Sequence, residues 1–352
     1  MQEEKDMRKH GLLLLILLAG IQVLVAEVIS VPGLGKPDSL TLFKDRLYIT
    51  DQEKVQIYSL QGSKPVLIKT FGRAGEGPAE FKVSAIDRIG LRIIVREENI
   101  LVNSWGKLST FSKDGTFIEE KKVLLTPHAQ FLKPVGNKYV GYIRANLDNV
   151  NYFFVHFFDP ITLQKEKEIC RMIGYIANNS IDIMWFALLF KNDTRRGPIY
   201  QVCNDRLFVV GDDCRIFIYD QQGKEFRSFS VHDYEKLEIT EDFKKEVMAY
   251  LEKRAPNIFR NAKRNGHFPR YLPLRSFRVD DGKLYVQTFK REKEKSEFYI
   301  FDLDGKLIRK VMAPIREAEF LVDYPFTIAN GKIYQVTENE DTEEWELHID
   351  NI

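Results

Sequence analysis

Short segments in which apolar and polar residues alternate recur along the chain, and turn-forming residues separate them. Alternation over about four to eight residues predicts β-strands. The first group of predicted strands comprises Ser39–Phe43, Arg46–Thr50, Val55–Leu60 and Val66–Phe71. In four groups, a turn that ends in glycine separates the third strand from the fourth, at 60–62, 113–115, 221–223 and 303–305. Because such turns favour tight hairpins, the pattern predicts a repeated unit of four antiparallel strands.

The repeated unit can be traced six times to the end of the sequence. We therefore predict an all-β fold, a six-bladed β-propeller of four-stranded blades. Inner-strand candidates are Ala85–Ile89 and Arg92–Val95 in the second unit and Gln130–Leu132 in the third. The sixth unit lacks an outer strand, whereas Glu27–Val31 has no partner in its own neighbourhood. Since an open sheet edge is a liability, Glu27–Val31 is expected to close the last blade.

Two connections are much longer than the others, at 171–198 and 232–273. The first contains the apolar run 181–190, either an exposed patch for a partner or, as we favour, a short helix packed on the ring. The second predicts a helical insertion between blades 4 and 5, with Thr240 as N-cap and Pro256 as its end. Both connections join an outer strand to the next inner strand, so both insertions are expected on one face.

Residues 1–26 have the pattern of a signal peptide, in which Arg8 and Lys9 precede the apolar run Leu12–Ala26. The run is about fifteen residues, short of the roughly 20 that span a bilayer, so cleavage after Ala26 is favoured over an uncleaved membrane anchor. The mature chain, 27–352, is predicted to be one propeller domain, periplasmic or secreted, monomeric and without a stable membrane span.

The net charge is +1, and it stays so without residues 1–26, which hold three basic and three acidic residues. No global field therefore attracts nucleic acid, which an exported protein rarely meets. The three cysteines, Cys170, Cys203 and Cys214, show no zinc-site spacing. Cys203 and Cys214 are expected on the first and third strands of one sheet, too far apart for a bridge, so free thiols are predicted.

The loop Phe71–Phe81 contains three glycines and a proline, which exclude both helix and strand. Its sequence resembles a loop of bacterial six-bladed propeller proteins related to NHL-repeat propellers, with matches at Gly72, Gly75, Glu76, Gly77, Pro78, Glu80 and Phe81. The resemblance implies the propeller fold and export, and it brings no catalytic residues with it. Many family members are lipid-anchored, whereas this chain has no cysteine at the predicted cleavage site. A clasp between blades is favoured over anion binding by the loop amides.

Positive charge gathers in the stretch 253–279, which has eight Lys or Arg residues and no Asp or Glu. Four arginines are candidates for binding an anionic ligand at the mouth of the channel: Arg73, Arg264, Arg270 and Arg275. Mixed with aromatic residues, such a stretch suits an anionic glycan, a small carboxylate or phosphate ligand, or a protein partner. The alternative is a solvated surface neutralised by the acidic run Asp233–Glu246.

Catalytic signals are weak in this sequence. His128 and His232 follow outer strands in equivalent loops, but a metal would need a third ligand that the sequence does not identify. No nucleophile motif is recognised, and no cofactor is predicted. The favoured function is an exported, non-catalytic binding or interaction module. The alternatives are a metal-dependent propeller enzyme of lyase or lactonase type and a scaffold of a cell-envelope complex.

Overall fold

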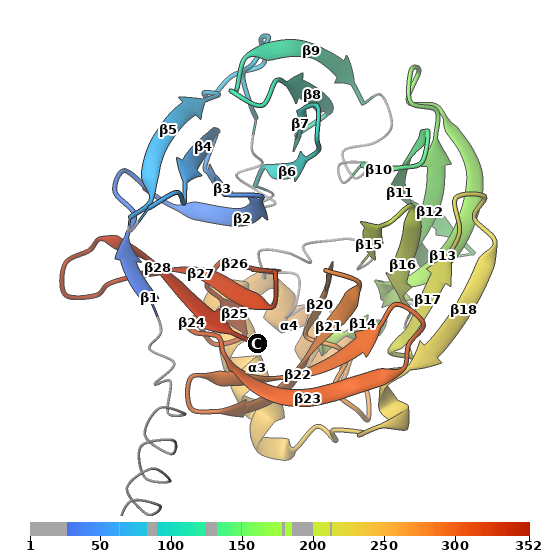
Figure 1. Ribbon diagram of the computed structural model, residues 1–352. Coiled ribbons are helices and arrows are strands. Elements are labelled where there is room, and N and C mark those ends of the chain that lie inside the picture. Colours follow the sequence, from blue (N-terminus) through green and yellow to red (C-terminus); the bar gives the residue numbers. More distant parts are fainter. Residues whose placement is uncertain are drawn as a thin grey trace, which may run out of the picture.

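The computed structural model describes residues 27–352, apart from 63, 83–89, 124–131, 149, 178–179, 185–199 and 212. The predicted signal peptide, His128 and the strand candidate Ala85–Ile89 lie outside the described residues. Six four-stranded antiparallel blades form a closed ring, as Figure 1 shows. The predicted six-bladed β-propeller is therefore confirmed.

The first three blades use strands in chain order from the channel outward. Blade 1 consists of β2 (Pro37–Phe43), β3 (Arg46–Asp51), β4 (Lys54–Ser59) and β5 (Val66–Phe71). Blade 2 consists of β6 (Arg92–Val95), β7 (Ile100–Ser104), β8 (Lys107–Phe111) and β9 (Phe117–Lys122). Blade 3 consists of β10 (Lys133–Val135), β11 (Lys138–Leu147), β12 (Val150–Phe158) and β13 (Lys165–Ala177).

The remaining blades follow the same plan until the last strand. Blade 4 consists of β15 (Tyr200–Cys203), β16 (Arg206–Val210), β17 (Arg215–Tyr219) and β18 (Glu225–Ser230). Blade 5 consists of β20 (Ser276–Asp280), β21 (Lys283–Glu292), β22 (Lys295–Asp302) and β23 (Leu307–Pro314). Blade 6 consists of β26 (Phe326–Ala329), β27 (Lys332–Glu338), β28 (Trp345–Asn351) and β1 (Glu27–Ser30).

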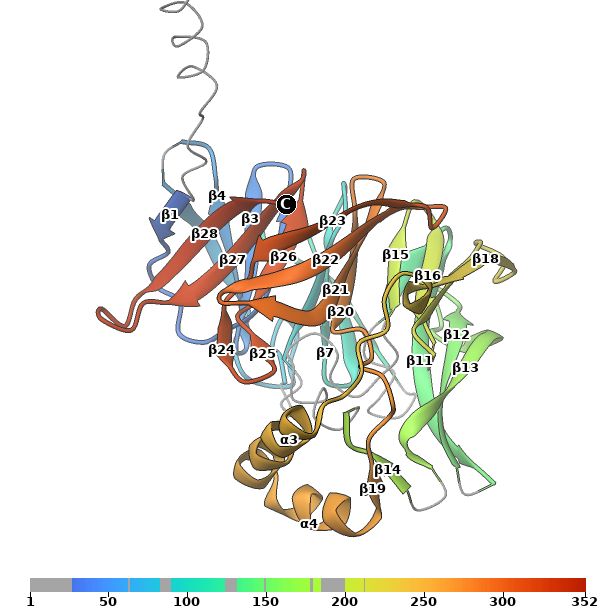
Figure 2. The same ribbon diagram turned by 90° about the horizontal axis from the view of Figure 1, so that it is seen from below.

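The N-terminal strand closes the ring, as the unpaired edge of the sixth unit predicted. β1 pairs antiparallel with β28, from Glu27 opposite Ile349 to Ser30 opposite Glu346. Just beyond β1, the Val31 N–H donates to the Trp345 carbonyl at 2.7 Å. Because the strands are antiparallel, Glu27 lies beside the C-terminal end of β28. That end is on the side of the ring opposite the helices in Figure 2.

Two details of the strand prediction need correction. The inner strand of blade 3 is Lys133–Val135, not Gln130–Leu132, where only Leu132 is described and is no strand residue. Pro256, predicted to end a helix, also begins a second one. α3 (Glu241–Arg254) is the predicted helix, with the Thr240 hydroxyl accepting from the Phe243 N–H at 3.2 Å. α4 (Pro256–Asn265) follows directly, with proline in the first turn, where its missing N–H costs nothing.

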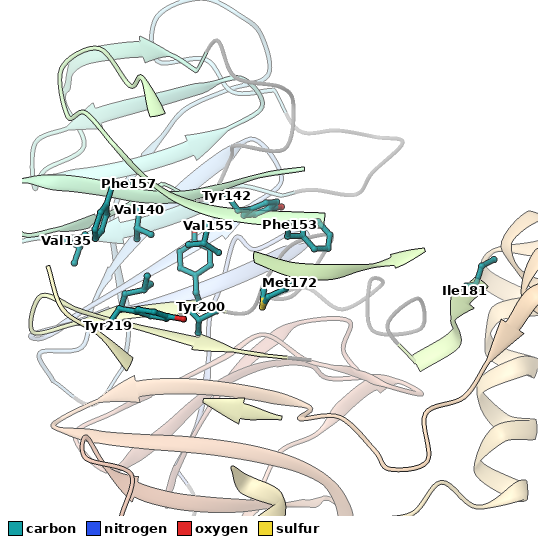
Figure 3. Close-up of a cluster of buried hydrophobic side chains, with 12 residues drawn as sticks. Val135, Val140, Tyr142, Phe153, Val155, Phe157, Met172, Ile181, Tyr200 and Tyr219 are labelled. Atoms are coloured by element: carbon teal, nitrogen blue, oxygen red, sulfur yellow. The ribbon is translucent and has the colours of Figure 1, made fainter. Parts of the chain in front are cut away.

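The hydrophobic core lies between neighbouring blades rather than in one central mass. Figure 3 shows the cluster between blades 3 and 4, where Tyr142 and Phe153 of blade 3 share a core with Tyr200 and Tyr219 of blade 4. These side chains are at most 7% exposed. Each interface buries aromatic and aliphatic area from two sheets, so the blades stabilise one another in sequence around the ring.

The glycine turns between third and fourth strands contribute to these interfaces. A Cβ on Gly305 would lie 2.4 Å from the Phe229 ring of blade 4, and one on Gly115 would lie 2.6 Å from the Phe71 ring of blade 1. Both glycines also have φ near +80°. The turns therefore need glycine for close approach as well as for the left-handed backbone. Gly331 has a similar φ of 69°, but a Cβ there would meet no heavy atom within 4 Å.

Candidate functional site

Additional structure gathers on one face of the ring, which we call the insertion face. Figure 2 places α3, α4, β14 (Ser180–Asp182), β19 (Gly266–His267) and the hairpin of β24 (Glu317–Glu319) and β25 (Val322–Asp323) on this side. Each belongs to a connection from the outer strand of one blade to the inner strand of the next. The prediction that the two long insertions share a face is met by their described parts.

The two helices form a cap with a hydrophobic core of its own. Val247 and Leu251 of α3 are fully buried, and Ala262 of α4 packs in the same cluster. From the first insertion, Ile183 and Met184 are also buried there. At the described start of the run 181–190, Ile183 and Met184 thus belong to the cap core, whereas Ile181 is buried with the core of blades 3 and 4. These three apolar residues do not form an exposed patch. β14 also pairs in parallel with β19 beyond α4, which links the two insertions.

The cap is attached to the ring through the hairpin β24–β25. Leu321 and Val322 of the hairpin belong to the cap core. Tyr250 of α3 contacts Phe320 with ring centroids 5.9 Å apart. At the end of α3, Arg254 forms an ion pair with Glu319. The cap therefore packs on blades 5 and 6 as a fixed part of the molecule.

The loop Phe71–Phe81 is a clasp between blades 1 and 2. Phe71 and Phe81 are buried in the core of this interface, where both contact Phe111. A Cβ on Gly72 would lie 2.2 Å from the Phe81 ring. From blade 2, the buried ammonium of Lys107 donates to the Gly77 carbonyl at 2.8 Å. The loop therefore joins blades 1 and 2, in agreement with the predicted clasp between blades.

Inside this loop, two amides that could have bound an anion already have acceptors. The Gly75 N–H donates to the Phe81 carbonyl at 3.0 Å, and the Gly77 N–H donates to the Glu80 carboxylate at 2.8 Å. The Gly77 amide, followed by Arg73, lowers the pKa of Glu80. Arg73 is exposed and lies 2.8 Å from the same carboxylate. The loop thus satisfies its own polar groups.

Arg275 was expected at the mouth of the channel, but the structure buries its side chain. Its side chain is 1% exposed, and its guanidinium lies 2.6 Å from the Asp323 carboxylate and 2.5 Å from that of Glu317. Burial disfavours the charged form, but the two carboxylates outweigh it and raise the pKa of Arg275. Arg291 approaches the same two carboxylates at 3.5 and 3.6 Å. Arg275 therefore fastens the hairpin β24–β25 to blade 5 and does not face the channel mouth as a free donor.

The other sequence candidates are spread over the insertion face. Arg73 lies between blades 1 and 2, whereas Arg264 and Arg270 belong to the connection between blades 4 and 5. Arg270 is exposed and pairs with Glu238 at 3.2 Å, which agrees with neutralisation by the acidic run. His232 lies in a short 3-10 helix, with its ring 5.8 Å from that of Tyr271. The structure does not bring the four arginines together into one ring.

The solvent-facing side of α4 carries cations that lack such partners. Arg260, Lys263 and Arg264 are exposed, and none forms an ion pair with a described carboxylate. Arg260 donates to the Asn257 side chain, and the Lys263 ammonium lies 5.9 Å from the Phe259 ring. We call these three residues the α4 basic face. Lys263 and Arg264 lie in the last turn of α4, where the negative end of the helix dipole stabilises positive charge. Arg260 lies one turn earlier and gains little from the dipole.

The basic residues of α3 provide a contrast within the same cap. Lys244 pairs with Glu241 at 2.6 Å, and Lys245 pairs with Asp242 at 2.9 Å. Their charges are compensated locally on their own helix. The excess of positive charge in 253–279 is visible in the sequence, but the sequence does not separate cations that are neutralised by carboxylates from those that are not. The carboxylates that pair with Arg254 and Arg275 come from the hairpin β24–β25. No local sequence pattern predicted this hairpin.

A cavity of about 470 Å³ opens beside the hairpin β24–β25, between blades 5 and 6. Its walls come from the β21–β22 turn, the hairpin and the β27–β28 turn. Buried residues Thr337 and His348 line it together with exposed Glu338 and Glu340. No sequence pattern indicates this cavity, because its walls are distant from one another along the chain.

Metal ligands do not converge at any place that the structure describes. Within these residues, no three His, Cys, Asp or Glu side chains are grouped so that they could hold a metal ion. Cys170, Cys203 and Cys214 are free thiols, as predicted. Among the described helices, none is both long and apolar enough to cross a membrane.

Comparisons with known proteins give similarity of fold only. No family model and no curated protein matches the sequence. BamB from Moraxella catarrhalis is 8% identical with a TM-score of 0.32, covering 88% of this chain and 71% of that one. A protein of unknown function from Bacteroides caccae is 14% identical with a TM-score of 0.40, covering 78% and 81%. The AfRom2 CNH domain is 14% identical with a TM-score of 0.37, covering 94% and 98%. All three TM-scores are low, and these similarities assign no function to the chain.

Proposed function

We propose that this protein is an exported, monomeric, non-catalytic interaction module that binds an acidic protein partner on its insertion face. The observation that carries the proposal is the α4 basic face, because its three cations are exposed and have no described ion-pair partner, on a helix that is otherwise fixed to the ring. Arg is favoured at protein interfaces, where its planar donors match carboxylates. Of the arginines singled out in the sequence, Arg264 remains in this proposed surface.

Export and family relationship are further parts of the proposal. Export is supported by the signal-peptide pattern of residues 1–26, which predicts a periplasmic or secreted protein. A relationship to exported NHL-repeat-like propellers is supported by the resemblance of the loop Phe71–Phe81. The propeller ring suits an interaction role because its rigid blades hold loops and insertions in place for recognition.

The chemistry of the α4 basic face sets what the partner must present. Positive charge without a nearby carboxylate attracts an acidic segment over a distance of about a Debye length, so association is expected to weaken with salt. A rigid helix loses little conformational entropy on binding, which favours recognition by α4 over recognition by a loose loop. The partner is therefore expected to offer aspartate and glutamate side chains to one helix face.

The test uses the full mature chain and charge reversal on the cap. Poly-L-glutamate is the first probe, with binding followed by fluorescence anisotropy at low and at physiological salt. Arg260→Glu with Arg264→Glu is expected to weaken binding by about tenfold or more, and Lys244→Glu with Lys245→Glu, the matched control on α3, by less than about twofold. Equal losses in the two double variants would refute a specific role for α4.

A second experiment identifies the partner directly. A photo-reactive amino acid in place of Asn261, exposed on α4, is expected to cross-link to a protein in intact envelopes of cells that express the chain. The cross-linked segment should be acidic, and the Arg260→Glu, Arg264→Glu background should abolish the product. Products that contain glycan instead of protein, or products that survive charge reversal, would overturn the proposal.

A further inference from the structure

One exposed apolar side chain from each blade lies near the end of the ring that faces away from the helices. We call these residues the apolar rim, and each is between 47% and 77% exposed: Val28, Ile68, Ile118, Ile161, Phe226 and Ile308. Each lies within the first three residues of an outer strand or, for Ile161, in the turn before it. Because the outer strands lead to the insertion face, their starts lie at the opposite end, where Figure 2 also shows β1.

In four blades, the rim residue is the extra residue of a β-bulge. In blade 2, the pairing with β8 passes from Phe117 to Glu119 and skips Ile118. The same shift skips Ile68, Phe226 and Ile308 in blades 1, 4 and 5. A bulge protects an open sheet edge whatever its side chain, and a charged residue there would protect it more. The repeated apolar residue therefore indicates contact with something other than water.

The other exposed large apolar side chains do not repeat in this way. Val66 and Leu67 precede Ile68 in β5 and enlarge the rim at blade 1. Among the described residues, only three lie toward the insertion face, and they occupy unrelated positions in the fold: Leu147, Ile173 and Tyr234. Exposed apolar surface is thus concentrated at the end of the ring that carries the rim.

A flat lipid surface is the partner that fits this distribution. A standard protein interface buries roughly 800 Å² on each side, whereas the rim has its side chains on all six blades around the ring. A flat surface reaches all of them at once. Under the proposed export, the apolar run Leu12–Ala26 joins the ring at Glu27, at the same end, so the rim is next to the membrane before cleavage.

Charges beside the rim indicate which lipid head groups it meets. Glu119 follows Ile118, but exposed cations directly follow the other three bulge residues: Lys69, Arg227 and Arg309. The Arg206 guanidinium also lies 4.9 Å from the centre of the Phe226 ring. Apolar side chains next to basic ones match the boundary between acyl chains and anionic head groups.

We propose that the apolar rim docks this end of the ring on a membrane surface that contains anionic lipids. The rim side chains enter only the head-group boundary, because charged residues adjoin them. This contact is separate from the α4 basic face, which it leaves directed away from the membrane.

The test measures flotation of residues 27–352 with vesicles, so that the run Leu12–Ala26 cannot bind lipid itself. Vesicles with equal amounts of phosphatidylcholine and phosphatidylglycerol should bind the protein, and vesicles of phosphatidylcholine alone should bind it about tenfold more weakly. No binding to the anionic vesicles, or equal binding to both kinds, would overturn the proposal.

Matched variants test the rim itself. Ile118→Ser with Ile161→Ser should weaken binding to the anionic vesicles by about tenfold or more, because two apolar contacts are lost. Leu147→Ser with Ile173→Ser makes the same change toward the insertion face and should leave binding within about twofold. Circular dichroism checks that both variants are folded. Losses of the same size in the two pairs would refute the rim.

Two further measurements separate the rim from other surfaces. Arg260→Glu with Arg264→Glu should leave vesicle binding within about twofold, since α4 lies at the other end of the ring, and loss of vesicle binding would overturn the proposal. Analytical ultracentrifugation without lipid should show a monomer. A dimer that Ile118→Ser with Ile161→Ser dissociates would assign the rim to a second copy of the chain instead.

Discussion

Replacement of Arg275 by methionine should destabilise the protein far more than the same replacement at Arg270. The two arginines are close in sequence, and each pairs with carboxylates, but the Arg275 side chain is 1% exposed and that of Arg270 is 76% exposed. Removal of one partner from a buried ion pair costs about 3–5 kcal/mol, because the other charge is left buried. An exposed pair contributes about 0–1 kcal/mol.

The charges that remain around Asp323 determine how much stability Arg275→Met should lose within the range of about 3–5 kcal/mol. Asp323 is 10% exposed and would lose its closest cation, although Arg291 at 3.5 Å remains and offsets part of the loss. We therefore expect a loss of about 3 kcal/mol, at the lower end of the range. Arg275→Met with Asp323→Leu removes both charges of the closest pair and should be more stable than Arg275→Met alone.

The assay is urea unfolding of residues 27–352, followed by tryptophan fluorescence and circular dichroism. A clear fall in the urea midpoint for Arg275→Met, with little change for Arg270→Met, is the expected result. Similar midpoints for these two variants would show that the buried network does not stabilise the attachment of the hairpin. Failure of the double variant to recover stability would show that packing of the arginine, not its charge, matters.

Three further predictions follow from the ring and its buried histidines. Deletion of Glu27–Ser30 should lower the thermal unfolding temperature markedly because it opens blade 6, and an unchanged temperature would contradict the closure. Gly305→Ala should destabilise more than Gly331→Ala in urea unfolding: both incur about 1–2 kcal/mol for the left-handed backbone, but only the first collides with a neighbouring ring. Burial comes first among the causes that lower the pKa of His156 and of His348, so the folded state binds their protons less readily than the unfolded state. The free energy of unfolding should therefore keep its full value above about pH 6.5, the pKa of a histidine in the unfolded chain, and should fall as the pH drops toward the lower pKa values of the folded state. Urea unfolding of His156→Gln with His348→Gln should show a weaker dependence on pH.

The propeller could be predicted because its determinants are local and repeated. Strand alternation, glycine turns and the missing outer strand of the last unit each depend on neighbouring residues, and together they specify the ring. α3 could be predicted in the same way, since Thr240 marks its start and the spacing of its apolar residues marks its buried face. α4 was missed because a proline ends one helix and begins another with equal ease, and sequence alone favoured only the first role.

The candidate site depended on contacts that no local pattern records. Arg270 and Arg275 look alike in the sequence, yet Arg270 pairs with Glu238, 32 positions before it, and Arg275 with Asp323, 48 positions after it. The cavity is assembled from three separate turns, so its composition is visible only after folding. Charge counting identified the basic segment 253–279, but only the fold distinguishes the cations that have structural ion-pair partners from those on α4.

The pairing of β1 with β28 also fixes how the molecule can be attached to other structures. Glu27 lies opposite Ile349, so the first described residue and the C-terminal strand end sit together on the side of the ring away from α3 and α4. An affinity tag, a fused domain or a tether joined directly before Glu27 or after Ile352 would therefore leave the cap and the cavity directed outward. For surface-based binding measurements, immobilisation through these ends presents the insertion face to the solution.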